Sequence, residues 1–547
     1  MIEVSDIRVA LENGRCEADI LQAALAHATR ILGVDPESVR NATLHRTSID
    51  ARKKSNVHLI VSIRLALESA RHEEQALGML DPRSAKHVKS VDDSAPCFPA
   101  NLGLSCTTRP VVVGAGCAGL FAALTLASAG LEPLLIERGS DAERRSAAVD
   151  LFNRTGKLDL NNNIQFGLGG AGTFSDGKLN TGTKNADHRL ILETFVDAGA
   201  PREILWEAKP HIGSDILPGV VTSMVERIRE LGGEVRFDTR LVDIKRTGSG
   251  AIAGIVVETD GTEETISCEK LILCCGHSAR DVFELLKARG FELMRKTFAM
   301  GVRIEHLQED IDRAQYGDAA GDPALGAAPY KLVTHTRNGR SLFSFCMCPG
   351  GEVVAAASEE GRVCTNGASL HAREGVNANA ALLVNVNPED LEGEDVLAGI
   401  ELQRTCEKMA FDLGGGEYRA PAQLVGDYLV GIPSSEGGAV VPTYPRGVTW
   451  GPVGLCLPAH VDETLRQGIP ELAVKLKGFG DPEAVLTGVE TRSSSPVTVV
   501  RDKECHAIGA EGLYPCGEGA GYAGGIMSAA ADGIRCARAL IKDVRNR

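Results

Sequence analysis

The stretch RPVVVGAGCAG, residues 109–119, decides the fold of this chain. Its short run of β-branched residues predicts a strand at 110–113, and the glycines after it predict a tight turn. The apolar segment that follows predicts a helix, and PLLIE at 133–137 predicts a second strand. A strand, a glycine turn, a helix and a strand within about 30 residues predict a β-α-β unit of the Rossmann type.

The spacing of the glycines predicts a dinucleotide site. Gly114 allows the tight turn, Gly116 lets the backbone approach a pyrophosphate, and Gly119 lets the helix pack closely on the strand. The free N–H groups and the dipole at the helix N-terminus favour an anion there. Glu137 ends the second strand, where its carboxylate is expected to accept hydrogen bonds from the adenosine ribose. This acid favours FAD or NAD over NADP, and the alternative is a glycine-rich turn without a ligand.

The C-terminal segment LYPCGEGAGYAGGI, residues 513–526, favours FAD over NAD. It contains a second formal G-x-G-x-x-G at 519–524, but too few residues follow for another complete β-α-β unit. We expect this loop to close a flavin site, with its acid at the ribityl chain and the helix N-terminus facing the flavin, where the helix dipole stabilises the anionic reduced form. The residues expected to bind the flavin here are Gly517, Glu518, Gly525 and Ile526.

Composition narrows the class of protein. The 547 residues are 43% hydrophobic and 24% charged, which is typical of a globular chain with several domains. A net charge of −15 argues against broad binding to nucleic acid or to an anionic membrane. We find no apolar run long enough to span a membrane and no secretory signal. The 15 cysteines include no zinc-type Cys-x2-Cys pair, so we expect reduced thiols in a cytoplasmic protein and no metal site.

Several longer strings resemble a bacterial family of FAD-dependent dehydrogenases of undefined substrate, related to the glutathione-reductase-like flavoproteins. The strings lie at 48–54, 163–179, 276–281, 344–351, 488–496 and in the C-terminal glycine loop. The resemblance covers nearly the whole chain and implies FAD binding and redox chemistry. Two features depart from the family pattern, because Cys274 and Cys275 precede Gly276, and Glu518 stands where the wider superfamily has an aspartate.

We expect a two-domain, glutathione-reductase-like α/β fold with an extra N-terminal domain. That extra domain is predicted to be a small ferredoxin-like βαββ variant, and the substrate domain is predicted to contain an antiparallel sheet. The predicted parts are the N-terminal domain at 1–67, a linker at 68–108, the FAD-binding domain at 109–160, 230–290 and 495–547, and the substrate domain at 161–229 and 291–494.

Further cofactor contacts are predicted in the glycine loop and beside the acid. Gly170, Gly172 and Thr173 belong to a loop whose bare amides would cradle a pyrophosphate or line the flavin, unless the loop serves only packing. Arg145 is a candidate for pairing with a phosphate, the alternative being a solvated helix arginine. Arg138, next to Glu137, is also assigned to the cofactor.

Two more cofactor contacts are expected at strand ends. Gly276 is expected at a turn that crosses FAD near its pyrophosphate, and His277 after it is either a cofactor contact or a structural histidine. The resemblance implies that Val242 offers its backbone to the adenine.

The catalytic residues are left open among four candidates. Cys346 and Cys348 form a Cys-x-Cys that is either a thiol–flavin relay or a pair of packing cysteines. Arg492 would hold an anionic substrate or the flavin C2 carbonyl, or else form an ion pair with Glu490. His211 is a candidate acid or base, with a structural role as the alternative.

The expected function is that of an FAD-dependent oxidoreductase that transfers a hydride between an unidentified small molecule and flavin N5. No second dinucleotide fingerprint exists, so NAD(P)H or a protein donor would bind transiently. The alternatives are a flavin-dependent monooxygenase or oxidase, and a flavin-containing protein that binds a partner through its N-terminal domain. No nucleic acid or membrane partner is expected.

Overall fold

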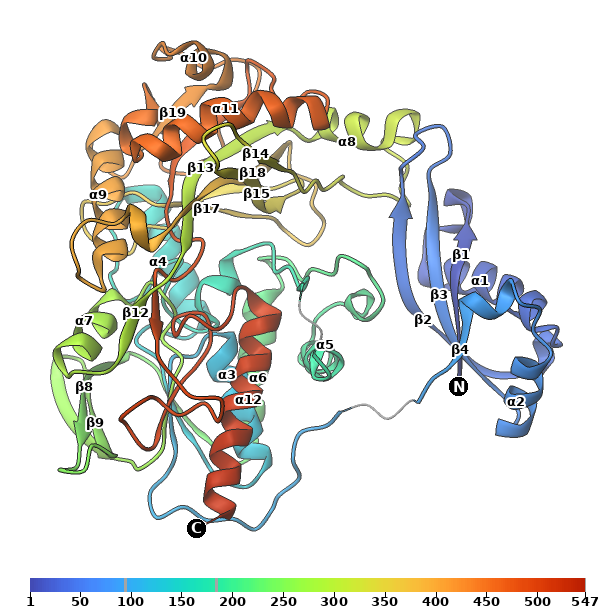
Figure 1. Ribbon diagram of the computed structural model, residues 1–547, viewed down its shortest axis with the longest axis horizontal. Helices are drawn as coiled ribbons and strands as arrows, with labels where there is room; N and C mark the ends of the chain where they lie inside the picture. The colour runs from blue at the N-terminus through green and yellow to red at the C-terminus, as the bar shows by residue number, and fades with distance from the viewer. Residues whose placement is uncertain (93–95, 183–184, 547) are drawn as a thin grey trace.

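The computed structural model describes residues 1–92, 96–182 and 185–546. The part of the chain that follows the N-terminal unit forms a larger lobe, and a five-stranded parallel sheet lies in one half of it (Figure 1). Its strand order is β23-β11-β5-β6-β7. The strands are β5 (Val111–Val113), β6 (Leu134–Ile136), β7 (Glu234–Arg236), β11 (Leu271–Leu273) and β23 (Leu513–Pro515). Val113 lies level with Ile136 and Leu273, so the loops after β5, β6 and β11 leave the sheet at one edge.

Successive side chains of each short strand point to opposite faces of this sheet, so each strand contributes to the apolar core on both faces. Val112 and Leu135 belong to the core on the face that carries α3, α6 and α12, whereas Val113 and Ile136 belong to the core beneath the β8–β9 strands and α7. Almost every residue of α3 is apolar and buried, as expected for a helix enclosed on all sides. These elements are α3 (Cys117–Ser128), α5 (His188–Asp197), α6 (Leu217–Glu230), α7 (Arg280–Ala288), α12 (Ile526–Arg545), β8 (Thr239–Arg246), β9 (Ile252–Thr259) and β10 (Thr262–Ser267).

A seven-stranded sheet, antiparallel except for its β19–β20 pair, forms the other half of this lobe. Its order is β14-β15-β18-β13-β21-β19-β20, and α11 contacts four of these strands (Figure 1). The strands are β13 (Phe298–Leu307), β14 (Val333–His335), β15 (Ser341–Cys348), β18 (Asn377–Val386), β19 (Ala420–Leu424), β20 (Val448–Trp450) and β21 (Val485–Glu490). The helices near them are α8 (Gln308–Tyr316), α9 (Ala398–Leu413), α10 (Val425–Val430) and α11 (Ala459–Lys475).

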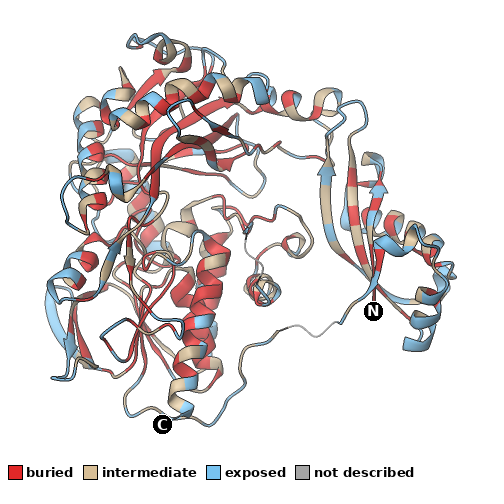
Figure 2. Cartoon of the chain, in the orientation of Figure 1, coloured by how far each residue is buried: buried red, intermediate tan, exposed pale blue. Residues whose placement is uncertain are grey.

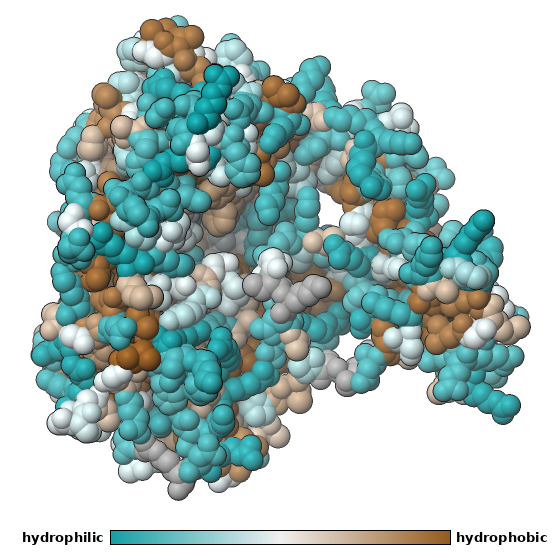
Figure 3. All heavy atoms as spheres, in the orientation of Figure 1, coloured by the Kyte–Doolittle hydropathy of each residue, from teal (hydrophilic) through white to brown (hydrophobic). Residues whose placement is uncertain are grey.

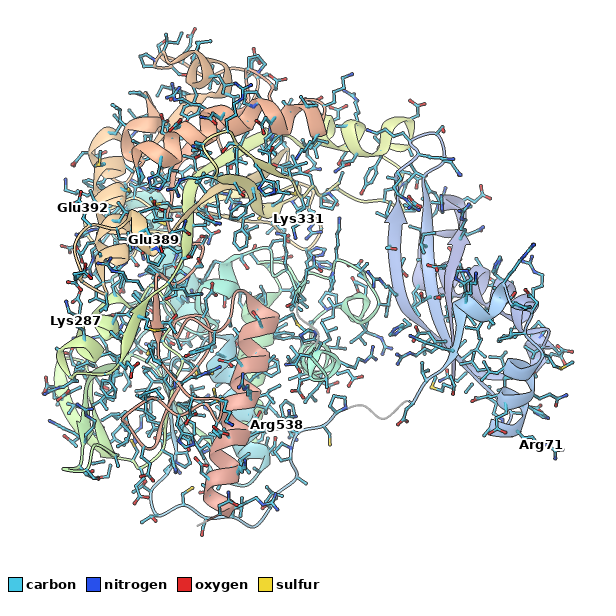
Figure 4. All side chains as sticks on the ribbon, in the orientation of Figure 1. Arg71, Lys287, Lys331, Glu389, Glu392 and Arg538 are labelled. Atoms are coloured by element: carbon cyan, nitrogen blue, oxygen red, sulfur yellow. The ribbon has the colours of Figure 1, made fainter. Side chains whose placement is uncertain are left out.

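The larger lobe also contains shorter helices and strands, and ion pairs link its segments. The remaining elements are α4 (Ala142–Thr155), β12 (Leu293–Arg295), β16 (Glu352–Ala355), β17 (Thr365–Ala368) and β22 (Val497–Val499). Arg538 on α12, labelled in Figure 4, forms an ion pair with Asp187 at 2.8 Å, and Lys287 on α7 pairs with Asp395 at 2.7 Å. Figure 2 shows the buried residues concentrated in the two large sheets and in α12.

The N-terminal unit is a four-stranded antiparallel sheet with two helices. Its order, β2-β3-β1-β4, and its βαββαβ connectivity are those of a ferredoxin-like fold. The elements are β1 (Ile2–Val9), α1 (Glu17–Leu32), β2 (Val39–Asp50), β3 (His58–Leu67), α2 (Ala70–Gly78) and β4 (Val88–Ser90).

This unit is longer than the predicted βαββ domain. The expected linker at 68–108 contains α2, which Ser69 caps by accepting a hydrogen bond from the amide of His72, and β4, which pairs with β1. Residues 93–95 of that expected linker lie outside the described residues. The sequence pattern missed β4 because this three-residue strand, VKS, has a single apolar residue.

Contacts at one side hold the N-terminal unit to the rest of the chain. The amide of Thr47 donates to the carbonyl of Trp206 at 2.6 Å, and the amide of Ala208 donates to the carbonyl of Thr47 at 2.8 Å. The Lys54 ammonium donates to the carbonyl of Ala314 near the end of α8. Figure 3 shows the unit as a separate lobe with an opening between it and the remainder. Among the described residues, no helix is both long and apolar enough to cross a membrane.

Candidate functional site

A cavity of about 360 Å³ lies between the two large sheets, at the edge where β5, β6 and β11 end. Ligands of open parallel sheets bind outside the carboxyl ends of the strands. Segments far apart in the sequence line the cavity. They are parts of Val113–Ala118, Glu137–Arg138, parts of Gln165–Asn180, Thr239 and Leu241, Cys274–Ser278 with Val282, Phe345 and Cys346, Asn366, Glu490 with Arg492 and Ser493, and Glu518 with parts of Gly524–Ala529.

Two glycine segments meet at the N-terminus of α3 and leave a bare backbone cradle. Gly116 is the N-cap of α3 and has no side-chain capping bond, and it forms a β-bridge with Gly169. A Cβ added to Gly116 would point into open space, its nearest neighbour being the Cα of Gly170 at 3.9 Å. Gly172 lines the same cavity. Unobstructed glycines at a helix N-terminus fit a pyrophosphate.

The other two glycines of the motif are packed. A Cβ on Gly114, whose φ is 99°, would lie 2.5 Å from the carbonyl oxygen of Cys274, although Gly114 still lines the cavity. A Cβ on Gly119 would lie 1.8 Å from the carbonyl oxygen of Gly114. Gly119 is not a lining residue, and it allows α3 to approach β5 closely.

The Glu137 carboxylate is buried at the cavity wall and accepts three backbone hydrogen bonds. Its Oε2 accepts from the amide of Ala115 at 2.8 Å, and its Oε1 accepts from the amides of Gly139 and Gly167 at 3.0 Å each. A carboxylate has about four acceptor positions. Glu137 therefore ties the loop after β5 to the 163–172 loop and keeps limited capacity for a ligand.

The two arginines after Glu137 have different surroundings. Arg138 lines the cavity, lies over the Phe166 ring and donates to both carboxylate oxygens of Asp281 at 2.8 and 2.9 Å. Arg145 on α4 is fully buried and is not a lining residue. Burial lowers the pKa of the Arg145 guanidinium to about 9.

The Arg145 guanidinium is occupied by the 163–168 loop. It donates to the carbonyls of Asn163, Ile164, Gly167 and Leu168 at 2.6 to 3.3 Å. Thr173, also predicted to touch the cofactor, is buried and donates to the carbonyl of Leu168 at 3.2 Å without lining the cavity. Arg145 and Thr173 thus hold the 163–168 loop by hydrogen bonds from the side away from the cavity.

Val242 lies at a β-bulge. Leu241 pairs with Val257 and Asp243 pairs with Val256, so Val242 has no partner in the β8–β9 ladder. A bulged residue leaves its backbone groups free of the ladder. Leu241 lines the cavity and Val242 does not.

The cavity wall formed by Gly276, His277 and Glu518 carries two half-buried titratable groups. The His277 ring Nε2 lies 3.7 Å from a Glu518 carboxylate oxygen. Burial, with the positive charges of Arg492 and Arg280 adding to it, lowers the pKa of His277 to about 3. Burial raises the pKa of Glu518 to about 7. His277 is therefore neutral at pH 7, and Glu518 is poised between its two protonation states.

The N-terminus of α12 faces this end of the cavity. Gly525 is its N-cap, with φ of 89° and no side-chain capping bond, and Ile526 begins the helix; both line the cavity. Gly517 lies behind the wall, where its amide donates to the Asp532 carboxylate at 2.8 Å.

Cys346 lines the cavity, whereas Cys348 is fully buried behind it. Arg303, buried in the middle of β13, donates to the carbonyl of Cys346 at 3.1 Å and approaches the Cys348 sulfur at 3.8 Å. The Lys178 ammonium lies 3.7 Å from the Cys348 sulfur. Glu490 forms an ion pair with Arg303 at 3.3 Å, and burial raises its pKa to about 7.

Arg492 lines the cavity, but its ion-pair partners are Glu407 and Glu359 rather than Glu490. Its Nε and Nη2 donate to the two Glu407 oxygens at 2.9 and 2.8 Å. Arg280 also donates to Glu407, at 2.7 Å, so two guanidiniums share one buried carboxylate. Their positive charges hold the pKa of Glu407 far below its usual range against the effect of burial.

His211 does not line the cavity. Its Nε2 lies 2.9 Å from the carbonyl of His371, and the two histidine rings stack at 5.1 Å. Burial lowers the pKa of His211 to about 4. The structure places it in the layer behind Lys178, with which it forms a β-bridge.

Two residues of the cavity wall, and one behind it, were not singled out from the sequence. Lys178 and Gln165 lie within a string that carries the family resemblance, where the glycines draw attention away from them. Arg303 lies behind the cavity wall, and the signal that reveals it is an arginine within the apolar segment FAMGVRIEHL.

Ligand atoms of Cys516, Asp532 and Cys536 lie within 4.8 Å of one another, and among the described residues they are the group with potential metal-ligand spacing. Arg501 donates to the Cys536 sulfur at 3.2 Å and to Asp532 at 2.6 Å. A guanidinium therefore already supplies positive charge to these groups.

Comparison with known proteins identifies the families that match. Residues 107–311 match the family described as FAD binding domain, and 297–493 match FAD-dependent protein, C-terminal domain-like. Residues 1–74 match a domain of unknown function. A relative from Clostridium beijerinckii, described as an uncharacterized protein, is 43% identical over 549 residues, covering 99% of this chain and 98% of the relative.

Solved structures that this chain resembles are distant in sequence. A geranylgeranyl bacteriochlorophyll reductase-like protein from Thermoplasma acidophilum is 11% identical, with 81% of this chain and 80% of that chain covered and a TM-score of 0.36. The 3-ketosteroid-Δ4-(5α)-dehydrogenase from Rhodococcus jostii RHA1 is 13% identical, with 82% and 100% covered and a TM-score of 0.33. At this level of similarity these structures carry no argument about the function.

Proposed function

This chain belongs to the family of FAD-dependent proteins and is an FAD-dependent oxidoreductase, and from that premise we propose that it transfers a hydride between a small organic molecule and the flavin. The sequence prediction of FAD as the cofactor is confirmed. The observation that carries the proposal is a single cavity that joins the glycine cradle of α3 to the thiol and charged groups of the antiparallel sheet.

The proposed domain layout is that of the glutathione-reductase-like flavoproteins. In this layout the FAD-binding domain consists of 109–160, 230–290 and 495–547, and the substrate domain consists of 161–229 and 291–494. It is supported by β5, β6, β7, β11 and β23, which come from the first set of segments and pair in one parallel sheet. The seven-stranded sheet is built from the second set.

The residues of the cradle would bind the cofactor. The amides at Gly116 and Gly172 would hold the pyrophosphate, with Glu137 at the adenosine ribose. Gly170, whose amide donates to the carbonyl of Gly167 at 2.9 Å, would line the cradle with its Cα. The backbone at Val242 would contact the adenine. Arg145 would act indirectly, because its four hydrogen bonds fix the loop that carries Gly170 and Gly172.

The opposite end of the cavity would bind the flavin ring. Gly276, neutral His277 and Glu518 would contact the ribityl and ring regions. The N-terminus of α12, where the amide of Gly525 donates to Glu518 at 3.4 Å, favours negative charge beside them. When bound, FAD supplies two-electron chemistry at the flavin ring. The protein orients the two reactants and excludes water between the two sheets.

A thiol on the cavity wall favours a dehydrogenase or reductase over an oxygen-activating enzyme. Cys346 faces the cavity, and reactive oxygen species would oxidise an accessible thiolate to the sulfenic acid and beyond. The small-molecule substrate would bind beside Cys346 and Arg492. The electron donor, NAD(P)H or a protein, would bind transiently.

The experiment is an anaerobic titration of the FAD-loaded protein followed by flavin absorbance. NADH and NADPH are added first, and reduced protein is then reoxidised with oxygen or with candidate organic acceptors. We expect slow reoxidation by oxygen and fast reoxidation by an acceptor. Fast reoxidation by oxygen with a hydroxylated product would overturn the dehydrogenase assignment in favour of a monooxygenase.

A further inference from the structure

The two cysteines of β15 lie at a break in its strand pairing. Phe345 pairs with Ala381, and Cys348 pairs with Asn379, so β15 contains one extra residue here. Cys346 has φ of 40°, a left-handed conformation that is uncommon for a residue with a side chain. Strained residues of this kind cluster at functional sites. The bulge turns Cys346 to the cavity and leaves Cys348 buried behind it.

The bulge also brings the Cys348 sulfur close to the Cys346 residue. In a regular strand, residues i and i+2 lie about 6.6 Å apart, which is near the upper end of the 4.4–6.8 Å range that a disulfide spans. Here the Cys348 thiol donates to the Cys346 carbonyl oxygen at 3.2 Å. The second cysteine's thiol therefore lies against the backbone of the first, with Cys346 facing the cavity and Cys348 buried behind it.

Charged groups around the pair favour a thiolate on Cys346. The cations are Lys178 and Arg303, balanced by Asp176 at 2.8 Å from the lysine and Glu490 at 3.3 Å from the arginine. The hydrogen bond from Cys348, with Lys178 and Arg303 adding to it, lowers the pKa of Cys346 to about 5. The pKa of Cys348 is raised well above its usual value, first by this hydrogen bond and then by burial.

The three other cysteines that line the cavity differ from this pair. Burial raises the pKa of the Cys274 thiol, and it raises the pKa of Cys117 and of Cys275 to about 12. The difference follows from the neighbours, since Cys346 has the Cys348 side chain, Lys178 and Arg303 beside it. The thiolate is the nucleophilic form of cysteine.

We propose that Cys346 and Cys348 form a thiol–disulfide exchange site for a small disulfide substrate, with Cys346 as the attacking thiolate and Cys348 as the resolving thiol. The proposal rests on the proposed function, because the oxidoreductase activity must supply the electrons. A short, strained disulfide is reduced easily, which suits a pair that must return to the dithiol in every cycle.

The reaction balances in two exchanges and one reduction. The Cys346 thiolate attacks one sulfur of the substrate disulfide, its S–S bond breaks, and the first substrate thiolate leaves and takes a proton. Cys348 then attacks the Cys346 sulfur, the second substrate thiol leaves with the Cys348 proton, and the Cys346–Cys348 bond forms. The substrate has gained two electrons and two protons. The protein disulfide regains the same number through the oxidoreductase activity.

The test counts leaving groups with dithiodipyridine, a small aromatic disulfide, on the FAD-loaded protein. Cys16→Ser and Cys97→Ser remove the exposed cysteines first. We expect the pair to release two thiopyridones per chain and to leave a 346–348 peptide that is two hydrogens lighter by mass. The Cys348→Ser variant should release one thiopyridone and keep a mixed disulfide on Cys346. The Cys346→Ser variant should release no thiopyridone from this site. Circular dichroism checks the fold of each variant.

Two results would overturn the site. One is a stable mixed disulfide of the reagent on Cys346 in protein that retains Cys348. The other is a failure of Cys346 and Cys348 to react with dithiodipyridine when the exposed cysteines of the parent protein do react. A second arm photoreduces the oxidised holoprotein without oxygen. The peptide should regain two hydrogens as the flavin is reoxidised, whereas a bleached flavin with an intact disulfide contradicts the proposal. If the protein binds no flavin, the proposed oxidoreductase function is wrong. The count of released thiopyridones would still test thiol–disulfide exchange at Cys346 and Cys348.

Discussion

Replacing Gly116 by alanine tests the cofactor cradle without disturbing the fold. Gly116 has φ of −74° and ψ of −179°, which alanine adopts without strain. The added Cβ would meet no atom closer than 3.9 Å, so the cost in folding free energy is small. The same Cβ would point into the space where the proposed pyrophosphate approaches the backbone at the start of α3.

The expected loss of affinity follows from the hydrogen bonds that the methyl group displaces. A hydrogen bond to a charged group contributes about 1.5–3 kcal/mol. If two amide–phosphate bonds are lost, affinity for FAD falls by about 3–6 kcal/mol, or roughly 10²–10⁴-fold. The free energy of unfolding of the apoprotein should change by less than about 1 kcal/mol.

The assay is quenching of flavin fluorescence on titration of apoprotein with FAD, together with urea denaturation. Gly219→Ala is the matched control, because Gly219 lies on α6 with no atom within 4 Å of an added Cβ. It should bind FAD normally and be slightly more stable. Unchanged FAD affinity in Gly116→Ala, at unchanged stability, would refute the assignment of this helix end to the phosphates.

Three further predictions follow from buried groups and from the N-terminal unit. Arg145→Gln should cost about 3 kcal/mol or more, because several buried carbonyls lose their donor, while exposed Arg144→Gln should cost less than about 0.5 kcal/mol in the same urea titration. The pKa of Glu490 is raised to about 7 in the folded protein, so the native state holds a proton that the unfolded chain releases above about pH 4.5. Glu490 should therefore lower the stability of the apoprotein between pH 4.5 and 7, by up to about 1.4 kcal/mol per pH unit. Glu490→Gln should remove this contribution to the slope in denaturation curves across the range, while the contribution of Glu518 remains; an unchanged slope contradicts the cause. Residues 1–92 alone should unfold cooperatively in circular dichroism, since they contain their own apolar core; a non-cooperative melt would show that this core needs the rest of the chain.

The parallel sheet and its glycine turn were predictable because their determinants are local. Gly114 and Gly119 can be read from spacing, and the structure gives each a close contact that no other residue would tolerate. The short strand β4 was missed because tertiary pairing, rather than its own composition, makes it a strand.

Side-chain partners in the site were the least predictable part. Arg145 could be read as a phosphate ligand or as a surface residue, and it is neither exposed nor in the cavity wall. Its partners are carbonyls about 20 residues away in a loop without regular structure. The bulge at Cys346 likewise depends on pairing with β18, which nothing in the local sequence indicates.

The hydrogen bonds that Arg145 and Glu137 form with the 163–168 loop affect how the protein acquires its cofactor. Arg145 binds the carbonyl ends of this loop, and Glu137 binds the amide of Gly167, so a cation and an anion hold opposite poles of its peptides. The loop is therefore ordered by the protein alone, and little conformational entropy remains to be lost when the ligand arrives. An apoprotein built in this way is a preformed receptor. It should fold before it is loaded, survive removal of the flavin, and accept modified flavins as replacements.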